Sequence, residues 1–249
     1  MFFEETVRPR VSDADRGGRL SCEALLRLLE DVGTHHSAAV SDGVIENRGD
    51  GIIWVLVEWR LKILRRPADR ETLTVATWAM GQAPSAFIRR GYTVTDGEGR
   101  EVLLAEGKFA LFNSETGRPV RIDESMFAAY RPEERDVFAS PAPKLRPLAA
   151  YRAETPFALR RDDIDFNGHV HNTRYVTFAL EALPRSLWEE GEIESFRLVY
   201  TRPVREGDGV TLKYGEKDGK HIVGVYVGDV PHALAEFRFE DKNACSEPC

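Results

Sequence analysis

Several features that define other protein classes are scarce or missing in this chain of 249 residues. Its three cysteines, Cys22, Cys245 and Cys249, do not make a disulfide framework, so a reducing cytoplasm is the simpler expectation. No apolar run approaches the roughly 18 residues that span a bilayer, and the acidic start lacks the pattern of a secretory signal. We therefore expect a cytoplasmic protein without stable membrane association.

A broad positive charge is also missing. The formal net charge is −7, which argues against general nucleic-acid binding but leaves room for an acidic protein partner. Arginines are present in local clusters. Ordinary solvated strand ends are one explanation for them, and a basic rim around a site is the other. The clusters are Arg65-Arg66, Arg89-Arg90, Arg160-Arg161 and Arg202 with Arg205.

The chain repeats itself once. Residues 13–20 and 163–170 align without a gap at an offset of 150 (Asp163 against Asp13), and an apolar helical stretch follows each. Further along, Trp59-Arg60-Leu61 and Arg66-Pro67 find an echo in Phe196-Arg197-Leu198 and Arg202-Pro203. We interpret this as a duplication. The predicted parts are a first repeat (1–118), a proline-rich linker (119–152), a second repeat (153–241) and a mobile tail (242–249).

Each repeat is predicted to hold one long helix and four strands. The first helix should begin near Ser21, a good N-cap, and the second near Asn172, with Pro184 ending it. Residues 54–63 alternate between apolar and polar, as a half-buried strand does. Similar runs lie at 72–80, 86–95, 101–113, 195–202, 209–216, 220–228 and 232–240. A largely apolar helix held in a curved antiparallel sheet is a hot-dog unit. The predicted fold is therefore α+β, a double hot-dog with a continuous sheet.

The segment from Asp163 to Asn172 is densely polar just before the second helix, and three kinds of site fit it in part. A calcium loop matches its first positions, but Arg174 stands where the loop needs a bidentate glutamate. A transition-metal site would use His169 and His171, whose rings point to opposite sides of an extended chain. Metal-free acid/base chemistry is the third and favoured interpretation.

Acid/base chemistry fits three residues of this segment. If the segment is extended, Asp165, Asn167 and His169 lie on one side of the chain. Carboxylate, amide and imidazole together can bind and deprotonate a water and hold a tetrahedral intermediate. In the first repeat the aspartates are kept, but Gly17 and Arg19 replace the amide and the imidazole. We therefore predict one site, in the second repeat, with Asp163 only satisfying the backbone.

These residues resemble a known family motif, D-x-N-x-H-V-x-N, which Asp165, Asn167, His169, Val170 and Asn172 match. With the duplication and the opening Ile53-Trp54-Val55, the chain resembles the acyl-ACP thioesterases over roughly residues 3–240. The resemblance implies hydrolysis of fatty acyl-acyl carrier protein to free fatty acid in fatty acid biosynthesis. It implies acyl carrier protein bearing an acyl-phosphopantetheine as the partner, and no cofactor or metal.

The resemblance also implies residue roles. Asp165, Asn167 and His169 would be catalytic, with either Asp165 or His169 as the base for water. The remaining residues predicted to act on the substrate are Asn172 of the motif, Trp54 along an acyl channel, and Arg202 where the phosphopantetheine arm enters.

There is one departure from the family. Its members place a glutamate, in plants followed by a cysteine, where this chain has Pro203. Glu206 or Glu181 would then supply the auxiliary acid/base group. An acyl-CoA thioesterase and a non-catalytic acyl-binding protein are the alternative functions. Chain-length preference and a homodimeric state are left open.

Overall fold

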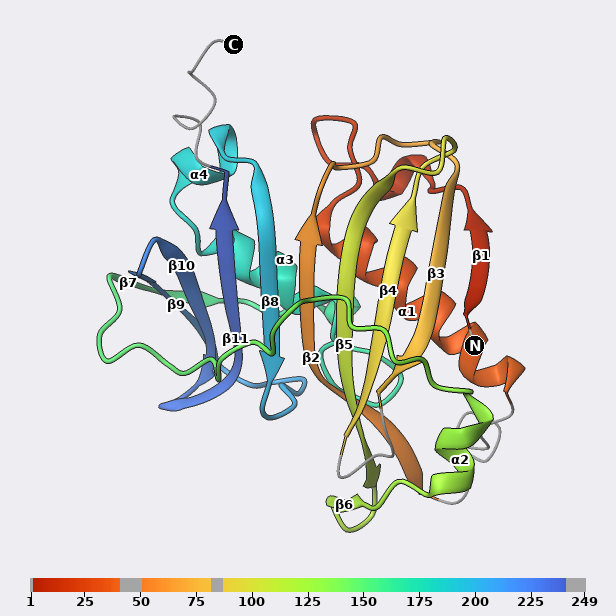
Figure 1. The fold of residues 1–249 in the computed structure, drawn as a ribbon. Helices are drawn as coiled ribbons and strands as arrows, with labels where there is room; N and C mark the ends of the chain where they lie inside the picture. Colours follow the sequence, from red (N-terminus) through yellow and green to blue (C-terminus); the bar gives the residue numbers. More distant parts are fainter. Residues whose placement is uncertain (1, 41–50, 82–86, 241–249) are drawn as a thin grey trace. The chain divides into compact units, whose positions relative to one another are not determined.

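The computed structural model describes residues 2–40, 51–81 and 87–240, and the chain divides into two compact units, 1–143 and 144–249. Each unit is an antiparallel sheet with a helix against it (Figure 1). The predicted tail, with Cys245 and Cys249, lies outside the described residues. Within the described ranges, no helix is both long and apolar enough to cross a membrane.

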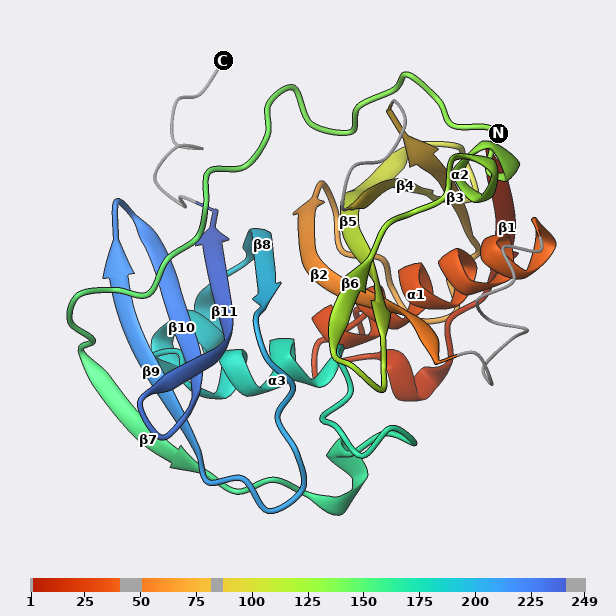
Figure 2. The same ribbon diagram turned by 90° about the horizontal axis from the view of Figure 1, so that it is seen from below.

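The sheet of the first unit has the strand order β1-β3-β4-β5-β2, and β6 pairs with β5. Seen from below, its strands curve around α1 (Figure 2). In chain order the elements are β1 (Phe3–Val7), η1 (Val11–Asp13), α1 (Cys22–Ala39), β2 (Ile52–Ile63), β3 (Leu73–Met80), β4 (Ile88–Thr95), β5 (Glu101–Asn113), β6 (Arg118–Val120) and α2 (Glu124–Ala129).

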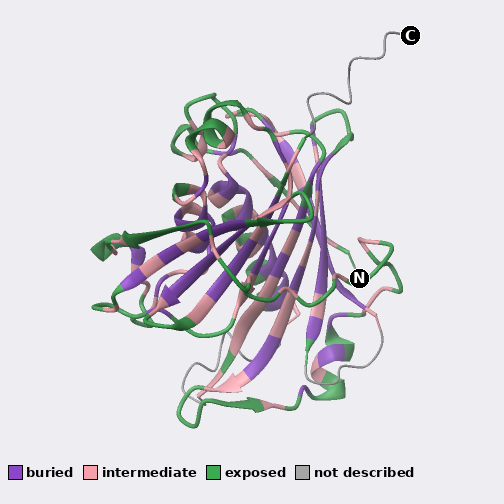
Figure 3. Ribbon diagram, turned by 90° about the vertical axis from the view of Figure 1, so that its left-hand side faces the viewer, coloured by how far each residue is buried: buried purple, intermediate pink, exposed green. Residues whose placement is uncertain are grey.

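Helix α1 begins where the sequence predicts, because the Ser21 hydroxyl accepts a hydrogen bond from the Ala24 N–H at 3.1 Å. Its side chains Leu25, Leu26, Leu29 and Val32 are almost completely buried. Burial follows the strands as well, while most connections between them are exposed (Figure 3). The apolar helix and the inner face of the sheet thus form the core.

The second unit has the strand order β8-β11-β10-β9-β7. Its elements are β7 (Ala153–Phe157), η3 (Arg161–Asp163), α3 (Arg174–Glu181), α4 (Arg185–Glu190), β8 (Ile193–Tyr200), β9 (Val210–Lys217), β10 (Lys220–Val227) and β11 (Val230–Phe239). The prediction of a long helix in this repeat was wrong. Helix α3 has 8 residues, because it begins two residues after Asn172 and ends at Glu181, before Pro184, which is the N-cap of α4.

The predicted strands are present within a few residues at their ends. In β2 the pairing with β5 shifts between Leu56 and Glu58, so the predicted alternation gives fully buried side chains only from Trp59 onward. Strands β4 and β5 form an antiparallel hairpin, and so do β9 and β10, which are joined through Asp218 and Gly219, both with positive φ.

Candidate active site

The polar segment before α3 is a tight turn that one aspartate holds together. The Asp165 N–H donates to the His169 carbonyl at 2.7 Å, and the Gly168 N–H donates to the Asp165 carbonyl at 3.0 Å. The Asp165 Oδ1 atom accepts the N–H groups of Asn167 (2.8 Å) and His169 (3.3 Å). Gly168 has a φ of 74°, which favours glycine. The carboxylate therefore organises the backbone of the turn.

This geometry corrects the prediction that the segment is extended. Residues Ile164 and Val170 pair as an antiparallel bridge, so the chain reverses direction between them. Asp165, Asn167 and His169 are brought together by the turn and not by strand alternation. The amide Nδ2 of Asn167 lies 3.3 Å from Asp165 Oδ2. An aspartate followed by Asn-Gly is typical of such a turn, so turn chemistry outweighed the extended pattern.

The first unit contains the same turn. Asp15 Oδ1 accepts the N–H groups of Gly17 (2.8 Å) and Arg19 (3.2 Å), and the Asp15 N–H donates to the Arg19 carbonyl at 2.8 Å. The two aspartates thus share a structural task. The amide of Asn167 and the imidazole of His169 have no counterpart in the first unit.

The aspartates two residues earlier, Asp13 and Asp163, also match. Asp13 Oδ2 accepts the Arg10 N–H at 2.8 Å, and Asp163 Oδ2 accepts the Arg160 N–H at 2.7 Å. An arginine of the following helix contacts the other oxygen in each unit. The backbone role predicted for Asp163 agrees with these contacts.

His169 is half-buried and faces Arg205. The two residues form an antiparallel bridge, and directly opposed residues of such a pair point to the same face. The Nε2 atom of His169 is buried and has no hydrogen-bond partner among the described residues. Burial lowers the pKa of His169, the positive charge of Arg205 lowers it further, and the negative charge of Asp165 opposes both. The ring is therefore kept neutral near pH 7, as a proton acceptor must be.

The second carboxylate oxygen of the turn has different neighbours in the two units. In the first, Arg66 contacts Asp15 Oδ2 at 2.8 Å and donates to the Leu20 carbonyl at 2.6 Å. In the second, the residue equivalent to Arg66 is Pro203, because the offset of 137 that relates Phe196 to Trp59 continues through this loop. Proline has no side chain that can pair with Asp165. The Asp165 carboxylate is therefore without the arginine that neutralises Asp15.

The alignment of Arg66-Pro67 with Arg202-Pro203 that was drawn from the sequence is wrong by one residue. With the offset of 137, Arg66-Pro67 aligns with Pro203-Val204. The Leu20 N–H donates to the Pro67 carbonyl, and the equivalent Val170 N–H donates to that of Val204. The displacement arose because both units place an arginine next to a proline in this loop, and sequence identity favoured the wrong register.

Two further residues contact the turn: Tyr175, which was not singled out from the sequence, and Arg205, which was named only as a member of an arginine cluster. The Tyr175 hydroxyl is buried and accepts the Val204 N–H at 3.1 Å, which ties α3 to the loop opposite His169. Burial raises the pKa of Tyr175 to about 12, so it remains a neutral phenol. Arg205 is the second of these residues, and it pairs with His169 as Ala68 pairs with Arg19 in the first unit. This difference between the two repeats is the sequence signal that could have pointed to Arg205.

Comparisons with known proteins bear on this geometry. The family model for the acyl-ACP thioesterase N-terminal domain matches residues 1–130, and that for the C-terminal domain matches residues 148–229. The chain belongs to the acyl-ACP thioesterase family. This confirms the resemblance drawn from the motif and the enzyme class it implies, a thioester hydrolase.

Curated relatives of this family member are plant enzymes. An oleoyl-acyl carrier protein thioesterase of Coriandrum sativum is 27% identical, over 97% of this chain and 70% of the relative. A second from Arabidopsis thaliana is also 27% identical, over 84% of this chain and 62% of the relative. Both are chloroplastic proteins. This chain thus spans roughly two thirds of the length of these relatives.

Solved structures of this family confirm the double hot-dog fold. An acyl-ACP thioesterase from Bacteroides thetaiotaomicron superposes with a TM-score of 0.84 at 22% identity, covering 96% of this chain and 98% of the other. The 12:0-ACP thioesterase from Umbellularia californica gives a TM-score of 0.83 at 22% identity, covering 97% and 98%.

The auxiliary residues predicted from the sequence lie in different places. Glu206 is exposed and directly follows Arg205, so it lies close to the turn. Glu181 is exposed and is the last residue of α3, about 10 Å along the helix from Arg174, where the helix leaves the turn. Of the two, only Glu206 lies near His169. Pro203 uses its carbonyl to accept the His232 Nδ1–H at 2.9 Å.

The predicted substrate-binding residues are also dispersed. Asn172 lies two residues before α3, where its carbonyl accepts the Tyr200 hydroxyl at 2.9 Å. Trp54 lies on β2 of the first unit and packs against an apolar cluster that includes Leu111 and Phe127. Trp78, on β3, is completely buried, and its indole N–H donates to the Arg135 carbonyl, which makes it part of the core.

The two arginine clusters of the first unit do not form a rim around a site. In the first unit Arg65 and Arg66 bind carboxylates, Arg89 binds Glu106 through two hydrogen bonds, and Arg90 is buried against His36. Arg202 and Arg205 of the second unit are exposed, and neither guanidinium binds a carboxylate of the described residues. In the described ranges, no group of three His, Cys, Asp or Glu side chains is placed to hold a metal ion.

Proposed function

We propose that this chain hydrolyses the thioester of fatty acyl-acyl carrier protein and releases the free fatty acid, with the Asp165–His169 turn as its active site. The observation that carries the proposal is the difference between two otherwise matching turns. Only the second turn has an imidazole and an amide, and only its carboxylate lacks an arginine partner among the residues that the structure describes. A turn needed for folding alone has no use for these changes.

Of the two candidate bases, the contacts support His169. Asp165 is engaged by two backbone N–H groups, a task that Asp15 performs in the first unit without any chemistry. His169 has an Nε2 atom with no hydrogen-bond partner among the described residues, and a pKa that burial lowers. Asp165 then positions the backbone of His169 and stabilises the imidazolium that forms.

The reaction needs two proton transfers, and His169 performs both. Its Nε2 takes a proton from water as the water oxygen attacks the thioester carbonyl carbon, which gives a tetrahedral oxyanion. The Asn167 amide donates a hydrogen bond to that oxyanion. When the intermediate collapses, the C–S bond breaks and the imidazolium returns its proton to the leaving thiolate. The products are the carboxylic acid and the free thiol of the carrier arm.

The remaining residues assist binding or proton transfer in this proposal. Trp54 lines the acyl channel, Asn172 helps to hold the thioester, and Glu206 is the auxiliary acid/base group. The protein works in the cytoplasm on acyl carrier protein, which cell fractionation and co-purification would test. Self-association into a homodimer is tested by sedimentation at several concentrations.

The experiment that tests the function is a hydrolysis assay with purified protein on acyl-carrier protein and acyl-CoA of matched chain lengths. We expect the larger kcat/KM on the carrier-protein substrate, and its loss in His169→Ala. Preferred turnover of acyl-CoA would establish the alternative thioesterase. Tight binding of acyl groups without release of product, in the wild type and in the variant alike, would establish a non-catalytic acyl-binding protein.

A further inference from the structure

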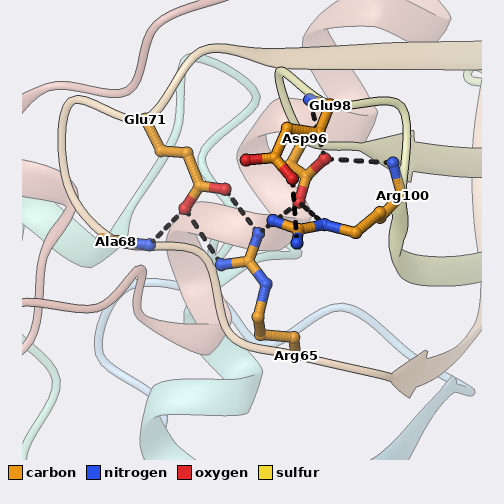
Figure 4. Close-up of polar contacts among 6 residues, drawn as sticks. All are labelled: Arg65, Ala68, Glu71, Asp96, Glu98 and Arg100. Carbon is orange, nitrogen blue, oxygen red and sulfur yellow. Dashed lines mark hydrogen bonds and ion pairs between the residues drawn. The ribbon is translucent and has the colours of Figure 1, made fainter.

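Arg65 of the first unit is held by a closed network of charges (Figure 4). Its guanidinium binds both oxygens of Glu71, at 2.5 and 3.1 Å, and Asp96 Oδ2 at 3.0 Å. Arg100 binds the same Asp96 oxygen at 2.9 Å. Glu71 also accepts the Ala68 N–H at 2.9 Å. Arg65 thus has its charge neutralised by two carboxylates of its own unit, although its side chain is 41% exposed.

Arg202 occupies the position of Arg65 in the second unit. The N–H groups of Leu64 and Arg65 both donate to the carbonyl of Val102, and those of Thr201 and Arg202 both donate to the carbonyl of His232. Three residues later the match continues, because the Arg205 N–H donates to Asp208 at 2.8 Å as the Ala68 N–H donates to Glu71. The same offset of 137 (Arg202 against Arg65) relates each pair of residues within this loop.

Both carboxylates that hold Arg65 are changed in the second unit. Asp208, which replaces Glu71, is one methylene shorter. Val227 replaces Asp96, since it follows Tyr226 in β10 as Asp96 follows Thr95 in β4, and it packs against an apolar cluster. As a result the exposed guanidinium of Arg202 has no hydrogen bond or ion pair with any residue in the described ranges. The second unit therefore keeps the arginine of this network without the ion pairs that hold Arg65.

We propose that Arg202 binds the phosphate group of the substrate's phosphopantetheine arm, an inference that rests on the thioesterase function proposed above. A planar guanidinium matches phosphate oxygens with two parallel hydrogen bonds. On a chain of net charge −7, phosphate is otherwise repelled, so an unneutralised arginine beside the site supplies the local attraction.

The position of Arg202 along the loop suits this task better than that of Arg205. Arg205 lies directly opposite His169. In the substrate, the whole pantetheine chain separates the phosphate from the thioester, so the phosphate must bind well away from the imidazole. The three residues from Arg205 back to Arg202 span at most roughly 10 Å of chain, and the arginine side chain adds to that reach.

The test compares two small thioesters that differ only in the phosphate, acyl-phosphopantetheine and acyl-pantetheine. For Arg202→Gln we expect kcat/KM on the phosphate-bearing thioester to fall about tenfold, through KM, as loss of a charge-assisted bidentate contact predicts. Turnover of acyl-pantetheine should be unchanged. Calorimetric binding of phosphopantetheine, which needs no hydrolysis, should weaken by the same factor.

Two further variants use the comparison between the units. Asp208→Glu restores the length of Glu71 and keeps the acceptor for the Arg205 N–H, so it should capture Arg202 and raise KM for the phosphate-bearing thioester without removing the arginine. Arg65→Gln is the matched control in the first unit. It should lower the thermal stability and leave the KM values of both thioesters as they are.

Three results would overturn the inference. These are an equal loss on both thioesters in Arg202→Gln, unchanged binding of phosphopantetheine by that variant, and a loss seen with acyl-carrier protein alone, which would assign Arg202 to the protein surface of the partner. Failure of the proposed function would be recognised separately, by absence of hydrolysis of any thioester by the wild type, and the binding measurement would still decide the role of Arg202.

Discussion

The turns at Asp15 and Asp165 have the same backbone hydrogen bonds and different surroundings. In the first unit, the carboxylate is paired with Arg66, and the positions two and four residues after Asp15 hold Gly17 and Arg19. In the second, Pro203 removes the arginine, and the equivalent positions hold an amide and an imidazole. Because the fold needs the aspartate in both units, its presence alone is no sign of catalysis. The side chains around it carry that information.

The most severe test removes the imidazole. His169→Ala should lower kcat/KM for thioester hydrolysis by about 10² to 10⁴-fold, the usual contribution of a positioned acid/base group. Folding should survive, because only the backbone of residue 169 takes part in the turn. The matched change, Arg19→Ala, should leave turnover as in the wild type. Equal activity in all three proteins, measured by release of free thiol, would remove the basis for the site.

The two aspartates should separate stability from activity. Asp165→Asn keeps an acceptor for the turn but removes the charge that stabilises the imidazolium, so kcat should fall by about 10²-fold with little change in melting temperature. Asp15→Asn breaks the pair with Arg66 and should destabilise the fold by about 1–3 kcal/mol without changing kcat. Calorimetry and steady-state kinetics on both variants would check this. Loss of kcat in Asp15→Asn and loss of stability in Asp165→Asn would instead place the chemistry in the first unit.

The pH dependence should show the effect of Arg205. A neutral His169 is required, so kcat/KM falls as pH decreases through its pKa, which burial and Arg205 hold below the ordinary value for histidine. Replacing Arg205 by Gln removes the positive charge, raises this pKa, and should move the acidic limb of the profile to higher pH. An acidic limb that stays in place in Arg205→Gln would mean that another group titrates there.

The smallest expected effect concerns the network that holds Arg65. Burial alone would raise the pKa of Asp96, but hydrogen bonds from Arg100, Glu98 and Arg65 outweigh it and lower the pKa to about 2. Because this carboxyl is more acidic in the folded state, its contribution to stability is present above the unfolded pKa of about 3.9 and is lost as pH falls toward 2. Asp96→Asn should therefore lower the melting temperature by a few degrees at pH 7 and much less near pH 2. The same deficit at both pH values would contradict this.

Sequence patterns predicted the strands and α1 well, because alternation and an apolar helix depend on burial that each segment shows by itself. They predicted the second helix as too long. Its apolar residues continue to Leu183, but the helix already ends at Glu181, ahead of Pro184. For the site, the composition of the turn was readable but its shape was not. An Asp-x-Asn-Gly segment suits both an extended chain and a hairpin, and the pairing of Ile164 with Val170 decides between them. The contribution of Arg205 depends on tertiary pairing with His169, which no local pattern encodes.

In this turn one residue supplies the structure and others supply the chemistry, and this separation affects how such a site can be gained, lost or engineered. Asp165 Oδ1 holds the turn through backbone amides, so the identities of residues 167 and 169 are free to change without loss of the scaffold. A duplicated gene can therefore keep one copy active and let the other decay while both still fold. The same freedom makes the first unit a natural host for engineering, where Gly17→Asn, Arg19→His and Arg66→Pro would transplant the second set of side chains onto a backbone that already has their geometry.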